Sequence, residues 1–230
     1  MYFQHSTNIW HDYPELVAGV LFIDGITNDV SVESRLAPFI TRATTRLDGK
    51  TEGELPEIQA WRRVFARMGL KPTQYRCASE SLLRRFRKEN ALPRIHPLID
   101  LCNAASLASA IPVAVFDVSR IADYLEVRYA AGDESYETFS GEIETPLAGE
   151  VIFADGKGRA HARRWSNRQS GLSAISNSTA SALIVAEAMH AKASSEIPQL
   201  IATLADELDA VWSIEPKTSI LSESSPRFAF

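Results

Sequence analysis

The stretch LPRIHPLIDLCNAASLASAIPVAVFD, residues 92–117, contains the pattern that decides the fold. Pro97 and Pro112 enclose a run of small and apolar residues, which predicts a buried helix at about residues 97–110. Proline suits the first turn of a helix and cannot continue one, so the two prolines mark its start and its end. After Pro112 the chain changes to short apolar segments typical of strands, beginning with residues 112–117.

Two polar residues interrupt the apolar surface of this helix. Asp100 and Asn103 are three positions apart and are therefore neighbours on one side. A buried carboxylate or amide without a partner costs about 1–3 kcal/mol, so each needs a hydrogen bond. Both could brace adjacent loops; alternatively, Asn103 reaches a pocket and Asp100 orients it. The small residues at 104–106 would let another segment approach closely.

Helical and strand-like patterns are partly segregated along the rest of the chain. Before residue 92 we expect a strand at 16–25, a helix at 31–47, an amphipathic helix from Pro56 to Gly69, an extended segment at 74–78 and a helix at 79–90 with Ser79 as its N-cap. After residue 117 we expect strands at 125–130, 135–140, 150–155 and 159–165, a serine-rich loop at 170–181, a strand or short helix at 181–189, a helix at 196–212 and an irregular tail from Glu215 to Phe230. This order favours an α+β fold, with a mixed and largely antiparallel sheet packed against helices, over a doubly wound parallel sheet.

Composition sets the broad class of the protein. The 230 residues suffice for one large domain or two small ones, and since no linker is evident we expect a single domain over residues 1–230. No apolar run approaches the roughly 20 residues of a membrane helix, and the N-terminus lacks the pattern of a secretory signal. Cys77 and Cys102 have no metal-ligand spacing and suit buried positions in a reducing compartment. We therefore expect a cytoplasmic protein.

The charge is distributed unevenly along the chain. The net charge is −5, yet residues 62–94 carry ten Lys or Arg against two Glu, and residues 157–168 carry five Lys or Arg and no acid. These first and second basic segments predict a positive face for a polyanion such as a nucleic acid. The alternative is that they are simply solvated faces of helices and strands.

Motifs of several common enzyme classes are missing. The sequence has no G-x-S-x-G, no H-E-x-x-H, no P-loop and no G-x-G-x-x-G before a helix. Its five histidines are scattered, and no pair has helical ligand spacing. The sequence therefore argues against a zinc, P-loop or dinucleotide enzyme, and we expect no metal and no cofactor.

Several ordered motifs resemble one known family. They are R-x-x-S-E-x-L-L-R-R at 76–85, L-P-x-I-x-P-L-I-D-x-x-N-x-x-S-L-x-S at 92–109, P-V-A-V-F-D at 112–117 and E-V-I-F-A-D at 150–155, followed by Arg163, Trp165, Arg168, Gln169 and Ser170. The set resembles the B3/B4 editing domain of the bacterial phenylalanyl-tRNA synthetase beta subunit and its free-standing relatives. The resemblance covers a core of about 56–187, flanked by an extension at 1–55 and by a helix and tail at 188–230.

This resemblance implies that the chain hydrolyses an incorrect aminoacyl ester at the 3′ end of a tRNA, acting in trans. The synthetase domain removes tyrosine from tRNA(Phe), whereas a free-standing relative removes canavanine from tRNA(Arg), the substrate that we expect here. Canavanine has an oxygen in place of one methylene of arginine, and a binding pocket rejects a near-isostere by only about 10- to 200-fold, so a second hydrolytic step is needed. An aminoacyl ester is already activated, so a positioned water can attack it without a protein nucleophile.

The chain departs from the synthetase pattern at two positions. Ala114 stands where that pattern has a histidine, and the region of Arg168 stands where it has a glutamate. These departures argue against specificity for tyrosine. They leave open a non-catalytic tRNA-binding module, a deacylase of another mischarged tRNA such as Tyr-tRNA(Phe), and a hydrolase of small aminoacyl or peptidyl esters.

Three groups of site residues follow from the resemblance and the chemistry of the side chains. The expected catalytic residues are Asn103, Gln169 and Ser170. The expected substrate-binding residues are Ser79, Glu80, Asp100, Ser106, Ala114, Asp117 and Trp165. The residues expected to hold the acceptor end of tRNA are Arg76, Arg84, Arg85, Arg87, Lys88, Arg163, Arg164 and Arg168. Structural roles remain open for Ser79 as a helix cap, Glu80 as a first-turn acid, Asp117 in a turn and Trp165 in the core.

Overall fold

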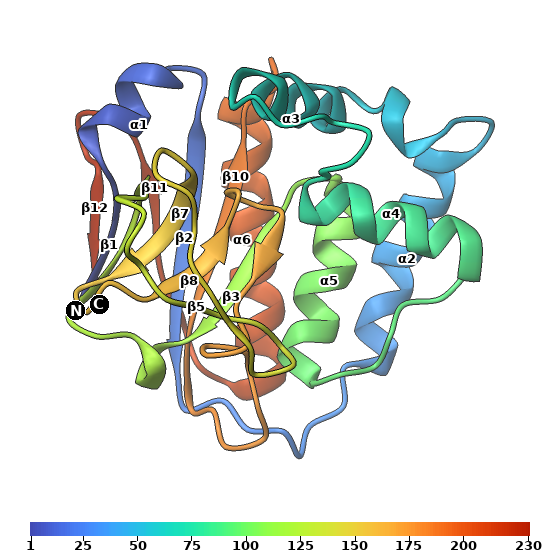
Figure 1. Ribbon diagram of the computed structural model, residues 1–230. Coiled ribbons are helices and arrows are strands. Elements are labelled where there is room, and N and C mark those ends of the chain that lie inside the picture. The colour runs from blue at the N-terminus through green and yellow to red at the C-terminus, as the bar shows by residue number, and fades with distance from the viewer.

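The computed structural model describes all of residues 1–230 and contains twelve strands, six α-helices and two short 3-10 helices (Figure 1). In chain order the elements are β1 (Tyr2–His5), α1 (Thr7–Asp12), β2 (Val17–Asp24), α2 (Glu33–Leu47), η1 (Glu52–Glu54), α3 (Pro56–Arg67), α4 (Ala78–Glu89), α5 (Pro97–Ser109), β3 (Val113–Asp117), η2 (Val118–Arg120), β4 (Tyr124–Tyr129), β5 (Tyr136–Glu137), β6 (Ile143–Glu144), β7 (Val151–Asp155), β8 (Ala160–Arg163), β9 (Arg168–Gln169), β10 (Ser181–Ala188), α6 (Ala193–Trp212), β11 (Lys217–Leu221) and β12 (Arg227–Ala229).

The strands form two main sheets. One sheet has six strands in the order β12-β1-β4-β7-β8-β9, the other has four in the order β11-β2-β10-β3, and β5 and β6 form a separate ribbon. Every pair is antiparallel except β1 and β4, which are parallel. The predicted class, α+β with a mixed and largely antiparallel sheet packed against helices, is therefore confirmed.

The four-stranded sheet is buried on both faces, as β10 shows. Ala182 and Ile184 belong to a core of 24 buried residues that the sheet shares with α2, α5 and α6. Leu183 and Val185 belong to a core of 32 buried residues that includes the inner face of the six-stranded sheet. Because successive side chains of a strand point to opposite faces, Glu187 lies on the side of Leu183 and Val185, between the two sheets.

The predicted helices begin and end where the local sequence directs. In α5 the ring Nδ1 of His96 accepts a hydrogen bond from Leu98 N at 3.2 Å, and the helix closes at Ala110, which has φ of 60°. After α3, Gly69 has φ of 74°, a conformation that glycine adopts without strain. The loop following Gly69 then turns away from the helix, as in many helix C-termini. None of the helices is both long and apolar enough to cross a membrane.

Two local predictions are corrected by the structure, and a third, which had left two alternatives open, is resolved. The tail after Glu215 forms β11, which pairs with β2, and β12, which pairs with β1, so the two chain ends lie together (Figure 1). For the segment 181–189 the strand alternative is confirmed, and this strand lies at the centre of its sheet. Only Tyr136–Glu137 of the segment 135–140 is a strand. Pairing with distant strands decides each of these cases, and a local pattern does not report it.

Ser79 is not the N-cap of α4. The cap residue is Cys77, whose side chain makes no capping hydrogen bond, and Ser79 is fully buried in the first turn. Burial raises the pKa of the Cys77 and Cys102 thiols to about 12, so both are held as thiols. The prediction that both cysteines are buried is confirmed.

Gly19 allows α6 to approach β2 closely. A Cβ at this position would lie 2.3 Å from Cγ1 of Ile201 and 2.8 Å from Cγ2 of Ile197. Because both neighbours lie in a packed core, we expect Gly19→Ala to lower the free energy of unfolding by about 1–3 kcal/mol. Urea denaturation measures this loss, and an unchanged midpoint would show that α6 can move away without penalty.

Candidate functional site

An inner pocket opens at one end of the space between the two sheets. Its cavity volume is about 60 Å³, which is smaller than the roughly 300–1,000 Å³ of a site for a drug-sized molecule and has room for a small group only. Its walls come from β3, β10 and the segment that joins β8 to β9. The lining residues that matter for its chemistry are Ala114, Trp165, Asn167, Arg168, Gln169 and Glu187.

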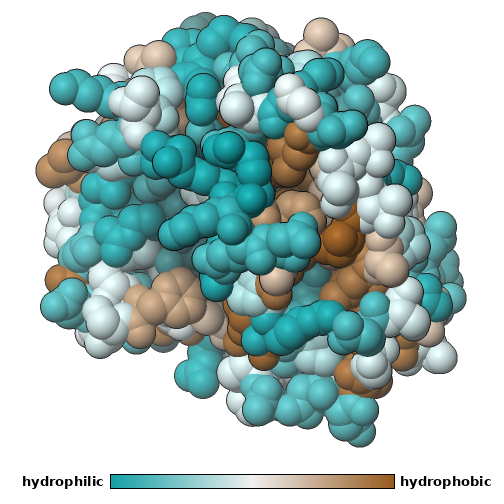
Figure 2. Space-filling view, turned by 90° about the vertical axis from the view of Figure 1, so that its right-hand side faces the viewer, coloured by the Kyte–Doolittle hydropathy of each residue, from teal (hydrophilic) through white to brown (hydrophobic).

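An outer pocket of about 310 Å³ adjoins the inner one, and the two share Ala78, Val113 and Asn167 in their walls. The outer pocket adds Asn103 and Ser106 from α5, together with Arg85 from α4. Asn103 therefore reaches a pocket, as one of its two predicted roles requires, because it lies on the side of α5 that faces this hollow. The surrounding face, which carries α2 and α4, is mostly hydrophilic with a narrow strip of apolar side chains (Figure 2).

Two side-chain amides in these pockets keep hydrogen-bonding capacity. Gln169 Nε2 donates to the carbonyl oxygen of Val115 at 2.6 Å, which fixes the amide, while its Oε1 has no partner within the chain. Asn103 is half-buried, and its amide makes no hydrogen bond within the chain. Such preorganised polar groups in a largely apolar hollow suit the orientation of a ligand or of a water molecule.

Ser106 also lines the outer pocket, but its hydroxyl serves the helix end. Its Oγ donates to the carbonyl oxygen of Ile111 at 2.6 Å. This bond holds the chain as it passes from α5 into β3, and so places Ala114 in the wall of the inner pocket. The predicted substrate contact of Ser106 stays a prediction.

Glu187 is a functional candidate that the sequence reasoning missed. Its Oε1 accepts hydrogen bonds from Nε1 of Trp165 at 2.9 Å and is 2.7 Å from Nε2 of His5. Its Oε2 has no partner within the chain, and the residue lines the inner pocket. The alternation of β10 was the available signal, because a glutamate that shares a face with Leu183 and Val185 must be buried.

Trp165 forms the buried wall of the inner pocket. The residue is fully buried, with its indole ring in edge contact with the ring of Trp61 at 5.4 Å between centroids. Because no face of the ring is exposed, Trp165 does not offer a stacking surface for a terminal adenine. Its structural alternative, a core or wall residue, is the one that the structure supports.

Five other predicted site residues lie away from both pockets, with their polar groups engaged elsewhere. Asp100 Oδ1 accepts from Ile95 N at 2.9 Å, so Asp100 braces the loop before α5. Asp117 accepts from Ser119 N and from the hydroxyl of Thr179. Ser170 donates to the carbonyl oxygen of Glu137 at 2.7 Å and is fully buried. Ser79 lies 3.4 Å from the sulfur of Cys77.

Glu80 is the fifth of these residues and joins α3 to α4. Its Oε1 lies 2.6 Å from Nη2 of Arg62 and 3.5 Å from Nε of Arg76. The hydrogen bond to Glu80 raises the pKa of Arg62 above its usual value. A buried carboxylate takes the nearest cations as partners, and here the chain itself provides two.

The cationic residues differ in their availability. On α4, Arg84, Arg85, Arg87 and Lys88 are exposed, although Arg85 pairs with Glu89 and Arg87 with Glu52. Near the inner pocket, Arg164 packs over the ring of Tyr75, and Arg168 is 3.2 Å from Glu144. Surface pairs of this kind contribute little and can exchange for a phosphate.

Arg163 does not belong to an exposed cationic surface. Its side chain is 5% exposed and forms ion pairs with Glu150 at 2.9 Å and Glu144 at 2.5 Å. Burial acts to raise the pKa of Glu150, but the bonds from Arg163 outweigh it and hold that pKa below its usual value. Arg163 is therefore a structural residue in this fold. The two basic segments still meet, because Arg85 lines the outer pocket and Arg168 the inner one.

The fold and these pockets define an α+β domain with two adjoining pockets at one end of the space between its sheets. The profile of the B3/4 domain matches residues 60–200, which is more than half of the chain, and the chain belongs to the B3/4 domain family. The resemblance seen in the sequence motifs is thereby confirmed.

Two relatives of known identity are similar to this chain. A stretch of 75 residues is 33% identical to the phenylalanine–tRNA ligase beta subunit of Coxiella burnetii, and it covers 33% of this chain and 9% of that protein. An N-terminal fragment of the phenylalanyl-tRNA synthetase beta subunit from Pyrococcus horikoshii aligns in structure with a TM-score of 0.46 and 10% identity. That alignment covers 94% of this chain and 49% of the fragment.

Proposed function

We propose that this chain is an aminoacyl-tRNA deacylase that acts in trans on a mischarged tRNA. The observation that carries the proposal is the adjoining pair of pockets, whose walls hold the unpaired amide of Asn103 and the unpaired Oε1 of Gln169 together with Arg85 and Arg168. The kinship with a synthetase beta subunit supports tRNA as the partner. In this proposal the acceptor end lies along α4, and the aminoacyl group enters the inner pocket.

The reaction itself needs few groups from the protein. Water attacks the ester carbonyl, the bond between this carbon and the ribose oxygen breaks, and the terminal ribose hydroxyl leaves with a proton. Gln169 Oε1 is an acceptor that can orient the water, while the amide of Asn103 can donate to the developing oxyanion. Since the ester is activated, positioning by these two groups supplies the catalysis.

The floor of the inner pocket indicates the class of side chain. Glu187 offers the one carboxylate in the lining of this pocket, which suits a cation or a group with several N–H donors. The side chain of canavanine carries such donors, so canavanyl-tRNA(Arg) is the proposed substrate. A tyrosine hydroxyl could also donate to Glu187, which keeps Tyr-tRNA(Phe) as the alternative substrate.

A second candidate function is a non-catalytic tRNA-binding module. The observation that favours it is Ala114, a methyl group in the pocket wall where the synthetase pattern has an ionisable imidazole. In that case the pockets would bind the aminoacyl end and protect it, without hydrolysis.

A deacylation panel tests these proposals. The protein is incubated with tRNA(Arg) charged with canavanine or arginine, and with tRNA(Phe) charged with tyrosine or phenylalanine. Release of canavanine alone supports the proposal, and release of tyrosine alone supports the alternative substrate. Binding without release supports the module, whereas hydrolysis of minimal aminoacyl esters that is insensitive to tRNA and to salt would identify a small-ester hydrolase.

Asn103→Ala separates catalysis from binding. We expect this variant to lower the deacylation rate by about 100-fold, because loss of one oxyanion donor typically costs that much or more. Its affinity for tRNA should change by less than about 3-fold, since Asn103 is not part of the cationic surface. Single-turnover deacylation and filter binding measure the two effects.

The matched control is Asn177→Ala, in the exposed part of the loop that follows β9. This variant should match the wild type in both assays. Equal losses of rate and affinity in Asn103→Ala would contradict a catalytic role and indicate that Asn103 only supports the fold.

A further inference from the structure

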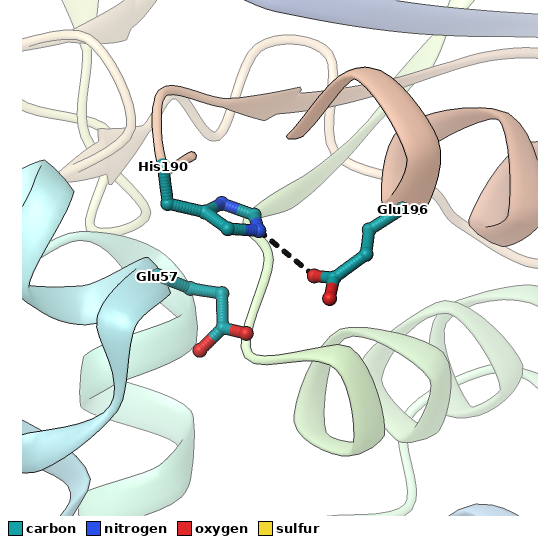
Figure 3. A group of neighbouring side chains, drawn as sticks. All are labelled: Glu57, His190 and Glu196. Atoms are coloured by element: carbon teal, nitrogen blue, oxygen red, sulfur yellow. Dashed lines mark hydrogen bonds and ion pairs between the residues drawn. The ribbon is translucent and has the colours of Figure 1, made fainter. Parts of the chain in front are cut away.

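Three side chains from distant parts of the chain converge behind the pocket region. Glu57 is in the first turn of α3, His190 follows β10, and Glu196 is in the first turn of α6 (Figure 3). One potential ligand atom from each lies within 4.8 Å of the others. His190 Nε2 and Glu196 Oε2 are 2.8 Å apart. Figure 3 shows the carboxyl group of Glu57 beneath the imidazole, facing the space between the other two.

Orphaned polar atoms provide independent evidence for a ligand. The side chain of Glu57 is 6% exposed, and its Oε2 is buried without any hydrogen-bond partner. His190 is equally inaccessible, with a side chain that is 3% exposed, and its Nδ1 also has no partner; because Nε2 is the nitrogen beside Glu196, Glu57 Oε2 is the atom that points to an ion. Buried polar atoms are nearly always satisfied, so each exception calls for an explanation, of which a bound ion is one.

The donor set suits a transition-metal ion. One imidazole and two carboxylates are a combination found in zinc sites, where bonds of about 2.0–2.2 Å place neighbouring ligands about 3.3 Å apart. The present separations need side-chain shifts of about 1 Å or less to reach that shell. Imidazole also favours zinc, iron, nickel and copper over magnesium and calcium.

The surroundings support the site in geometry and in access. Arg46 Nη2 donates to Glu57 Oε1 at 2.7 Å and Arg46 Nη1 donates to the carbonyl oxygen of Ser109 at 2.8 Å, which orients the glutamate against the end of α5. Outer partners of this kind fix the geometry of metal ligands. A groove between α2, α5 and α6, lined in part by Arg46 and Glu196, leads to the cluster and provides an entry path.

We propose that Glu57, His190 and Glu196 form a binding site for one divalent transition-metal ion, with zinc as the representative species. The ion would tie together α3, the end of β10 and the start of α6. This role is structural, and it is independent of ester hydrolysis, because none of the three residues lines the inner or the outer pocket. The expectation from the sequence that the protein carries no metal is revised by this proposal.

Metal titration of the full chain tests the site. Protein without an affinity tag is stripped with a chelator and titrated with ZnCl₂ in a calorimeter, and its melting temperature is recorded with and without zinc. We expect one ion per chain and a rise in melting temperature, because an ion that binds only the folded state stabilises it. Glu196→Gln should weaken zinc binding by more than about 100-fold, beyond the loss of about 10- to 100-fold that is typical for an outer partner.

The matched control is His11→Ala. His11 also lies 2.9 Å from a carboxylate, that of Asp12, but its side chain is 83% exposed and has no third ligand nearby. This variant should bind zinc as the wild type does. Glu196 is partly exposed at a helix start, so Glu196→Gln should fold, and circular dichroism verifies this.

Two results would overturn the proposal. One is the absence of stoichiometric zinc uptake by the stripped wild type, which would mean that the three side chains meet without an ion. The other is zinc binding of equal affinity in Glu196→Gln, which would place the ion elsewhere. Neither result affects the deacylation panel, so this proposal and the proposed function fail separately.

Discussion

Replacement of Glu187 by glutamine is expected to lower kcat/KM for canavanyl-tRNA(Arg) by about 10- to 150-fold. Hydrogen bonds to a charged group contribute about 1.5–3 kcal/mol, and each 1.4 kcal/mol is a factor of ten. Glutamine conserves the volume of the side chain, and its amide oxygen can still accept from Trp165 Nε1. The change therefore removes the negative charge at the pocket floor while the fold remains intact.

The comparison of two substrates shows whether Glu187 recognises the charge of the side chain. A tyrosine hydroxyl can still donate to the amide oxygen of glutamine, whereas a cationic side chain loses its charge partner, so any residual activity on Tyr-tRNA(Phe) should fall by much less than activity on canavanyl-tRNA(Arg). Parallel single-turnover measurements on the two substrates give the ratio directly. The control is Glu223→Gln, an exposed glutamate in the C-terminal segment, which should leave both rates unchanged.

A uniform loss on both substrates would contradict the assignment. In that case Glu187 would act only through the buried bonds to His5 and Trp165 that hold the pocket wall. An increase in activity on the neutral substrate would instead support the assignment, because glutamine reduces the penalty of placing an uncharged group against the pocket floor.

Replacement of Asp155 by asparagine should lower the free energy of unfolding by about 3–5 kcal/mol at pH 7. The carboxylate is buried in the turn between β7 and β8, where it accepts from Lys157 N and Arg159 N, and from the guanidinium of Arg159 at 2.6 Å. It also accepts from Ala122 N and lies 3.2 Å from His161 Nε2. Asparagine replaces one acceptor oxygen with a donor, which leaves buried donors unpaired.

The pH dependence follows from the pKa of the same group. Burial acts to raise the pKa of Asp155, but the hydrogen bonds from His161 and Arg159 outweigh it and hold the pKa far below its usual value of about 3.9. The stability that the carboxylate contributes is therefore complete above about pH 5 and is lost as the pH falls toward the folded-state pKa. The difference between the wild type and Asp155→Asn should be constant from pH 5 to 8 and should shrink below about pH 4.

Urea denaturation across this pH range measures both predictions. Asp133→Asn is the control, because Asp133 is exposed and forms no ion pair, and its effect should stay within about 0.5 kcal/mol at every pH. A penalty for Asp155→Asn that is the same at pH 3 and pH 7 would show that the lost contacts matter through packing and not through charge.

Much of the fold could be predicted because its signals are local. Pro97 and Pro112 mark the two ends of α5, and Gly69 ends α3. The turn Asp155–Gly158 joins two apolar strands. Each of these features is encoded within a few residues. The C-terminal strands were missed for the opposite reason. β11 is stabilised by β2, roughly 200 residues earlier, and a polar five-residue segment has no strand pattern of its own.

The residues predicted for the candidate site also fall into two groups, those that line the pockets and those that brace the fold. The motif positions of Asn103, Ala114, Arg168 and Gln169 pointed to a site, and the structure places all four around the adjoining pockets. Asp100, Asp117 and Ser170 belong to the same motifs, but their hydrogen bonds are satisfied by nearby backbone and side-chain groups. A motif reports that a residue matters to the domain, and it does not separate a brace from a contact with substrate.

The sequence by itself determined the class of fold, the family and the helix that carries Asn103, because periodicity, proline and turn residues act over short distances. Only the tertiary structure decided that Glu187 lines the inner pocket and that Arg163 is paired with two glutamates. It also decided that Glu57, His190 and Glu196 lie together. These arrangements join segments far apart in the chain. Burial and electrostatic pairing depend on which surfaces meet after folding, and one-dimensional spacing carries little information about them.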